Sequence, residues 1–119
     1  MTGAGSRRKG HAFERSLVHQ FRAVFPDANI RRGLQSRGGS EVPDVDVPGW
    51  HVEAKAHRKV NLRAALAQAI TDAAPDRVPI AVCKDNRAEP VVVLRLDDFL
   101  ALLARAKDVV PPASTAEAP

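Results

Sequence analysis

Three stretches of the chain carry apolar residues at the three- and four-residue spacing of an amphipathic helix. The first covers about residues 10–25 and stops at a Pro-Asp pair. The second covers about 62–74, with Asn61 as a plausible N-cap, and its small residues suit close packing on a sheet. The third follows Asp97, which caps it, and extends to about Lys107. The pattern therefore predicts three helices, each with one apolar side.

The segments between these helices have the composition of β-strands. They cover residues 29–35, 42–47, 50–56, 79–84 and 91–96. A turn signal, Pro48-Gly49, joins the second and third segments into a hairpin. The last two segments are almost continuously apolar, which predicts strands covered on both faces. The order helix, three strands, helix, two strands, helix predicts an α/β fold, with a five-stranded mixed sheet flanked by helices on both sides.

The length of 119 residues allows one core and no second one. We expect a flexible basic arm over 1–9, a single domain over 10–107 and a disordered tail over 108–119. The chain has no stretch of about 20 apolar residues that could span a bilayer, and no secretory signal is expected. The lone Cys83 lies in an apolar run and is predicted to be a core residue. These features favour a reducing cytoplasm, without a membrane partner.

Basic residues are concentrated in the first half of the chain. Residues 1–63 hold 12 Lys/Arg and 6 Asp/Glu, whereas residues 64–119 hold 6 and 8. This excess favours a nucleic-acid partner whose phosphates it neutralises, although an ordinary solvated basic surface would have the same composition. The candidate phosphate contacts are Arg7, Arg8, Lys9, Arg15, Arg22, Arg31, Arg32 and Arg37, followed after the hairpin by Arg58, Lys59 and Arg63.

Two carboxylates and one amine are placed on the predicted hairpin. Glu53 and Lys55 share one strand face, because successive side chains of a strand point to opposite sides, and the hairpin brings Asp44 near Glu53. Carboxylates that hold a divalent cation can assist phosphodiester cleavage, and Lys55 would point at the attacking water or the phosphate. Asp46 shares the face of Asp44 and is the alternative ligand, although Pro43 before Asp44 favours the latter.

A third carboxylate, Glu14, falls inside the apolar arc of the first predicted helix. A carboxylate on a buried face needs a partner or a metal ion. The alternatives are an ion pair with a nearby Arg and an edge position that reaches water. The four histidines lack the tight spacing of zinc ligands, and we predict no zinc site among them. They are His11, His19, His51 and His57.

This combination of Pro43-Asp44, Glu53-Ala54-Lys55 and an acid on the first helix resembles the PD-(D/E)xK nuclease superfamily. Over about residues 8–103 the chain most resembles the small archaeal and phage Holliday junction resolvases. The other residues that carry the resemblance are Gly10, Phe13-Glu14-Arg15, Arg31-Arg32, Ser36 with its Gly-rich loop, and Gln68. Asp72 departs from the family pattern, which usually has an aromatic residue four positions after that Gln.

The resemblance implies a restriction-endonuclease-like fold and a set of roles. Glu14, Asp44 and Glu53 would hold Mg²⁺, for which Mn²⁺ can substitute, and Lys55 would assist the water. Ser36 would lie near the scissile phosphate, and Gln68 near the lysine.

The expected activity is that of a structure-selective DNA endonuclease, most closely a homodimeric resolvase that cuts four-way junctions symmetrically. Two alternatives stay open: a related nuclease of the same superfamily that acts on linear or damaged duplex, and a non-catalytic DNA-binding module of the same fold.

Overall fold

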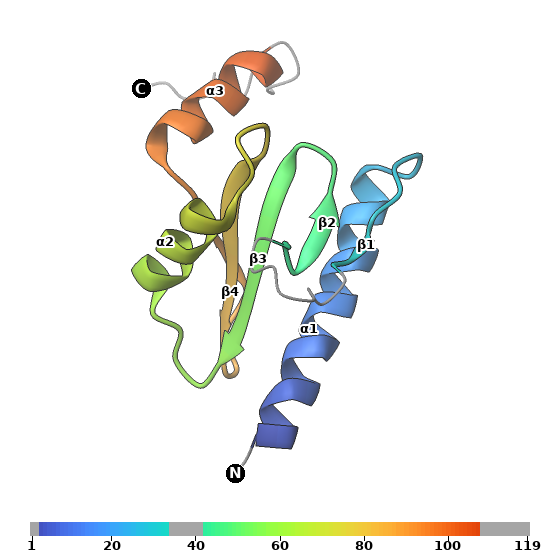
Figure 1. Ribbon diagram of the computed structural model, residues 1–119, viewed down its shortest axis with the longest axis vertical. Helices are drawn as coiled ribbons and strands as arrows, with labels where there is room; N and C mark the ends of the chain where they lie inside the picture. Colours follow the sequence, from blue (N-terminus) through green and yellow to red (C-terminus); the bar gives the residue numbers. More distant parts are fainter. Residues whose placement is uncertain (1–2, 34–41, 108–119) are drawn as a thin grey trace, which may run out of the picture.

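The computed structural model describes residues 3–33 and 42–107 of the chain, with side chains from residue 8 onward. Within these ranges the elements follow one another in the predicted order (Figure 1). They are α1 (Gly3–Val24), β1 (Arg31–Arg32), β2 (Val45–Val47), β3 (Trp50–His57), α2 (Leu62–Asp72), β4 (Val78–Asp85), β5 (Val91–Val93) and α3 (Leu96–Ala106). The predicted α/β class is confirmed. None of the described helices has the length and apolarity needed to cross a membrane.

The five strands form one sheet in the order β1-β2-β3-β4-β5. Only β3 and β4 run parallel, with α2 as the connection between them, and the other neighbouring pairs are antiparallel. The sheet is therefore mixed, as predicted. The turn between β2 and β3 contains Pro48-Gly49, and Gly49 has a φ of 88°, a left-handed conformation that glycine adopts without strain.

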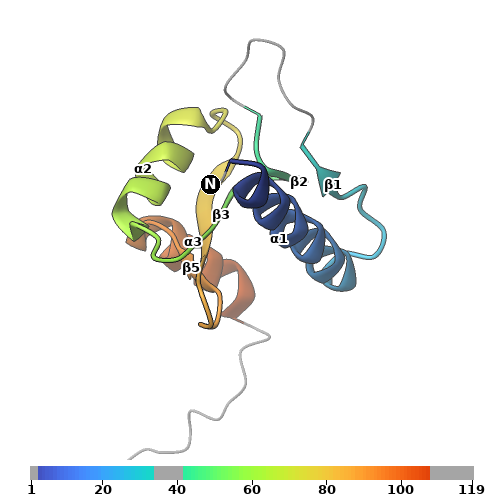
Figure 2. The ribbon, with the colours of Figure 1, turned by 90° about the horizontal axis from the view of Figure 1, so that it is seen from below.

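Two helices cover opposite faces of the sheet (Figure 2). On one face, Phe13 and Leu17 of α1 belong to the same buried cluster as Val52 of β3. On the other face, Ala65 of α2 packs with Cys83 of β4. Asn61 caps α2 as predicted, because its side-chain oxygen accepts a hydrogen bond from the Ala64 N–H at 3.0 Å.

Cys83 is a core residue, as its apolar surroundings in the sequence predict, with 2% of its surface exposed. Burial and the nearby charge of Asp85 raise the pKa of its thiol. The thiolate, which is the reactive form of cysteine, is therefore disfavoured.

The C-terminal part of the fold differs from the prediction. β4 is buried along most of its length, whereas Val91 and Val92 of β5 are 46% and 56% exposed, so the prediction that β5 is covered on both faces is wrong. α3 has no buried residue and lies beyond one end of the sheet (Figure 1). An apolar run shows that a strand can be covered, but a helix must pack on it to cover it.

The start of α3 is also corrected. Its N-cap is Arg95, and Asp97 lies inside the first turn, so the prediction that Asp97 caps the helix is wrong. Arg95 makes no capping hydrogen bond, and its Nε instead donates to Asp98 Oδ2 at 2.8 Å.

The first helix begins at Gly3, so it includes residues 3–9, whereas the predicted helix begins at about residue 10. Apolar spacing reveals only the part of a helix that packs on the core, whereas good helix formers such as Arg8 and Lys9 extend it without any such signal. The Lys9 ammonium also donates to Asn86 Oδ1 in the β4–β5 turn. The expected tail over 108–119 lies outside the described residues.

Candidate functional site

Asp44 lies directly before β2 and opposite Glu53 of β3. Its backbone N–H donates to Val52 O at 2.9 Å, and its carboxylate accepts a hydrogen bond from the Ala54 N–H at 2.8 Å. The predicted hairpin therefore places Asp44 beside the Glu53-Ala54-Lys55 segment. These contacts hold the Asp44 side chain on one side of the hairpin.

A glycine of the neighbouring segment, Gly33, also contacts the backbone of Asp44. The N–H of Gly33 donates to Asp44 O at 3.0 Å, which ties the end of β1 to the start of β2. A Cβ at residue 33 would lie 1.8 Å from Pro43 O, far inside van der Waals contact. Only glycine allows this close approach of the two backbones.

Glu53 and Lys55 share the face of β3 that meets α2. Lys55 Nζ lies 3.7 Å from Glu53 Oε2, and the exposed fractions of the two side chains are 28% and 6%. The carboxylate is thus buried while the amine reaches solvent. This arrangement leaves one oxygen of Glu53 directed to the lysine, and the other, Oε1, lies 3.4 Å from His51 Nε2.

Glu14 reaches the same neighbourhood from α1. Its Oε1 lies 3.1 Å from Arg32 Nε, so the ion pair considered for a buried carboxylate at this position is present. Its charge also acts on Asp44. The charges of Glu14 and Glu53, from two other segments, thus both act on Asp44, although the ligand atoms of these three carboxylates do not all lie within 4.8 Å of one another.

The ionisation of Asp44 reflects this crowding. The pKa of Asp44 is raised from 3.8 to about 7, mainly by burial and also by the charges of Glu53 and Glu14, against the hydrogen bond from Ala54 and the charge of Lys55. An acid with such a pKa is a good candidate for a functional group, because a bound cation would offset the repulsion. The electrostatics of the site thus favour a positive ligand.

Gln68 of α2 lies across from Lys55. Both residues line one hollow of about 220 Å³ between β3 and α2, together with Asn61 and Ala65. The structure therefore places Gln68 at the same hollow as the lysine, although Gln68 lies outside the stripe of buried residues, Ala65 and Ala69, by which α2 packs on the sheet. The reason is that α2 covers the sheet with a narrow stripe of small residues, so a residue beside the stripe still borders the sheet.

Asp46 has a different environment from Asp44. Its Oδ1 lies 3.0 Å from Arg77 Nη1, which also donates to the backbone oxygens of Val47 and Trp50 at 3.2 Å and 2.9 Å. Arg77 thus connects Asp46 to the two ends of the β2–β3 turn. Of the two aspartates, Asp44 is the one that lies with Glu53 and Lys55, and Asp46 is engaged in an ion pair.

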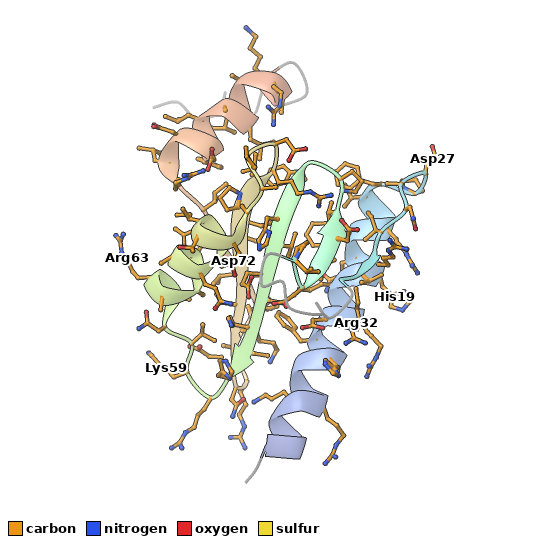
Figure 3. All side chains as sticks on the ribbon, viewed as in Figure 1. His19, Asp27, Arg32, Lys59, Arg63 and Asp72 are labelled. Atoms are coloured by element: carbon orange, nitrogen blue, oxygen red, sulfur yellow. The ribbon has the colours of Figure 1, made fainter. Side chains whose placement is uncertain are left out.

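Several of the predicted phosphate contacts gather between α1 and β1. Arg15, Arg31 and Arg32 line a hollow of about 390 Å³, which Arg22 and His19 also border. Figure 3 shows Arg32 and His19 on this side of the molecule, and Lys59 and Arg63 on the side of α2. Arg58 and Lys59 are exposed in the β3–α2 connection, and Arg8 is exposed on α1.

For three of the predicted residues, the structure describes no side chain. Ser36 and Arg37 lie outside the described residues, and so does the side chain of Arg7. Their predicted roles stay predictions.

Two residues of the neighbourhood were not predicted as site residues from the sequence. His51 is 1% exposed, and ligand atoms of His51, Glu53 and Asp72 all lie within 4.8 Å of one another. Asp72 lies at the end of α2, on the side of the sheet that this helix covers (Figure 3). Period-two spacing puts His51 on the face of Glu53, and helical spacing puts Asp72 one turn after Gln68, so both signals were present.

Comparison of the chain with known protein families, with curated proteins and with solved structures finds no match.

Proposed function

We propose that the protein is a Mg²⁺-dependent DNA endonuclease of the restriction-endonuclease-like fold, most closely a Holliday junction resolvase. The observation that carries the proposal is that the charges of Glu14 and Glu53 both act on Asp44, with the Lys55 ammonium 3.7 Å from Glu53 Oε2. These residues come from α1, the β2 end and β3, as the family resemblance requires. The mixed sheet with α1 and α2 on opposite faces supports the same fold.

The chemistry follows from the properties of these side chains. Asp44 and Glu53 would hold the metal ion through carboxylate oxygens, and Glu14 adds a third negative charge to the site. A divalent ion in this position supplies charge neutralisation at the phosphoryl oxygens and a polarised water. Lys55 is a three-fold hydrogen-bond donor that orients the attacking water or a phosphate oxygen. Asp44 must lose its proton before it can take part.

The arginine-lined hollow supports a nucleic-acid substrate. Arg15 and Arg31 offer guanidinium groups at its rim, and Arg32 belongs to both this hollow and the Glu14 ion pair. A DNA strand whose phosphates bind in this hollow would extend from it toward the carboxylates. Because such contacts are made to the backbone, they suit recognition of DNA shape rather than of base sequence.

A second copy of this chain is the partner that the proposal requires. Cutting two strands symmetrically needs two active sites, and the described part of each chain carries one such carboxylate group. The apolar side of α3 suits the contact, because four of its side chains are 41% to 67% exposed. They are Leu96, Phe99, Leu100 and Leu103. Light scattering should report a dimer for the wild type and a monomer for Phe99→Asp, and a monomeric wild type would contradict this part of the proposal.

One experiment tests the activity. A labelled four-way junction and a linear duplex are incubated with the wild type, with Asp44→Asn and with Asp76→Asn, in Mg²⁺ and in EDTA. Asp76 is an exposed carboxylate of the α2–β4 connection and serves as the matched control. We expect the wild type and the control to cut the junction in Mg²⁺ only, and Asp44→Asn to leave it intact. An uncut junction with the wild type, in Mg²⁺ and in Mn²⁺, would refute the proposal.

The same two substrates, used also in a binding assay with further variants, separate the alternatives. Preferential cutting of the linear duplex indicates a nuclease of the same fold with another substrate. Binding without cutting, lost when Arg31 and Arg32 are replaced by Ala and retained in Glu53→Ala, indicates a DNA-binding module. The arginine-lined hollow is the feature that favours this last alternative over other non-enzymatic roles.

A further inference from the structure

We propose that His51, Glu53 and Asp72 form a second cation site, which takes a divalent transition metal such as Mn²⁺, Co²⁺ or Zn²⁺. The site lies on the α2 side of the sheet and does not involve Asp44 or Glu14. One ligand atom from each of the three residues lies within 4.8 Å of the others. Metal bonds of about 2.0–2.2 Å place ligand atoms up to about 4 Å apart, so small side-chain movements would close the site on an ion.

The surroundings of the His51 ring are an independent observation that points to a ligand. The residue is 1% exposed, and its Nδ1 is buried without a hydrogen-bond partner among the described residues. Its Nε2 lies 3.4 Å from Glu53 Oε1, which is longer than a good N–H···O hydrogen bond. A buried imidazole with one unpaired nitrogen and one weak contact has lost its hydrogen bonds to water without gaining equivalent ones in the protein. Coordination of an ion is a common use of such a ring.

The charges around Asp72 point in the same direction. Asp72 is the last residue of α2, where the helix dipole is negative and disfavours a carboxylate. No ion pair within 4.0 Å joins it to a cation in the described part of the chain, and Glu53 beside it is 4% exposed. Lys55 approaches Oε2 of Glu53, on the oxygen away from the His51 contact. A cation between these groups would relieve the repulsion.

The donor set favours a transition metal over Mg²⁺. One imidazole nitrogen with two carboxylates suits Zn²⁺, Mn²⁺ and similar ions, whereas Mg²⁺ prefers oxygen ligands alone. His51 also lines a hollow of about 390 Å³, bordered by Asp46 and Arg77, which opens a route for the ion and for a water ligand.

Glu53 would belong to both sites. Its Oε1 faces His51, and its Oε2 faces Lys55. The second site goes beyond the proposed nuclease function and does not depend on it, because His51 and Asp72 have no part in that mechanism. An ion on Oε1 would hold the Glu53 carboxylate in one orientation and leave Oε2 free for the ion beside Asp44.

Metal binding alone tests the proposal. The full chain is titrated with Co²⁺ in excess Mg²⁺, and the visible absorption of the bound ion is recorded, followed by competition with Zn²⁺. The variants are Asp72→Asn, His51→Gln, Asp44→Asn and the control Asp76→Asn. Asp72 is partly exposed at a helix end, so its variant should fold even where His51→Gln does not, and thermal denaturation checks this.

We expect one Co²⁺ bound by the wild type, by the control and by Asp44→Asn, and at least about tenfold weaker binding by Asp72→Asn. Absence of Co²⁺ binding by the wild type would overturn the second site. Equal affinity in folded Asp72→Asn would do so as well, and so would loss of binding in Asp44→Asn, since the ion would then sit in the first site. Because Asp44→Asn abolishes the proposed cleavage and retains this Co²⁺, failure of the nuclease proposal and failure of the second site give different results.

Discussion

The two faces of β3 show how one strand can serve opposite purposes. On the face toward α1, Val52 and Ala56 are buried in the main apolar cluster of the protein. On the face toward α2, His51 and Glu53 are equally buried, with 1% and 4% of their surfaces exposed. The first face stabilises the fold by removing apolar surface from water. On the second face, burial of an imidazole and a carboxylate costs desolvation free energy and so does not stabilise the fold. We therefore expect these side chains to have a functional role.

The largest expected effect comes from the polar face. Glu53→Gln removes a negative charge without changing the size of the side chain, so cleavage of the junction should fall by at least about 10²-fold. The melting temperature should stay the same or rise, because a buried charge is removed. Single-turnover cleavage and thermal denaturation of the same preparation measure both. A variant that cuts normally, or that unfolds, would show that the two faces of β3 do not differ in this way.

The next effect concerns pH. The pKa of Asp44 is raised to about 7 in the metal-free folded chain, so cleavage at subsaturating Mg²⁺ should increase by up to about tenfold per pH unit below pH 7 and then level off. Without metal, the folded chain binds more protons than the unfolded chain between the ordinary pKa of 3.8 and about 7. Stability in EDTA should therefore fall as the pH rises through this window. Melting temperatures of the wild type should show the decline, and those of Asp44→Asn should not.

A substitution in the apolar cluster should lower the stability of the protein without changing its activity. Leu17 of α1 is 4% exposed and belongs to the main cluster, so Leu17→Ala should lower the free energy of unfolding by about 2–5 kcal/mol. Urea denaturation measures this loss. Cleavage per folded molecule should stay within about twofold of the wild type, because no residue of the site is touched. A large loss of activity in fully folded protein would mean that α1 positions the site more tightly than the contacts of Glu14 indicate.

The smallest effect should come from Asp46 of β2, the carboxylate that we do not assign to the site. Asp46 pairs with Arg77, and both side chains are about one third exposed. Asp46→Asn should therefore cost at most about 1 kcal/mol of stability and leave cleavage unchanged. Compared with Asp44→Asn in the same assay, this variant decides which aspartate belongs to the site. Inactive, folded Asp46→Asn would reverse the assignment.

The order of elements, the β2–β3 hairpin and the shared face of Glu53 and Lys55 could be predicted because they depend on local spacing. A strand repeats every two residues and a helix every 3.6, and the turn at Gly49 needs only its two central residues. The partly buried position of Glu14 followed from the same periodicity. Its partner Arg32 could only be named as one of several arginines.

The remaining features arise from contacts between distant segments, which no local pattern encodes. Arg77 pairs with Asp46 and not with Asp44, although it lies about thirty residues further along the chain. Asp72 comes close to His51 only because α2 packs back across β3. β5 and α3 have the apolar residues of covered elements, yet Val91, Val92 and the apolar side of α3 stay exposed, and only Val93 of β5 packs against the cluster around Cys83 within the described chain. Periodicity dictates which side of an element is apolar, and the tertiary structure alone decides what that side meets.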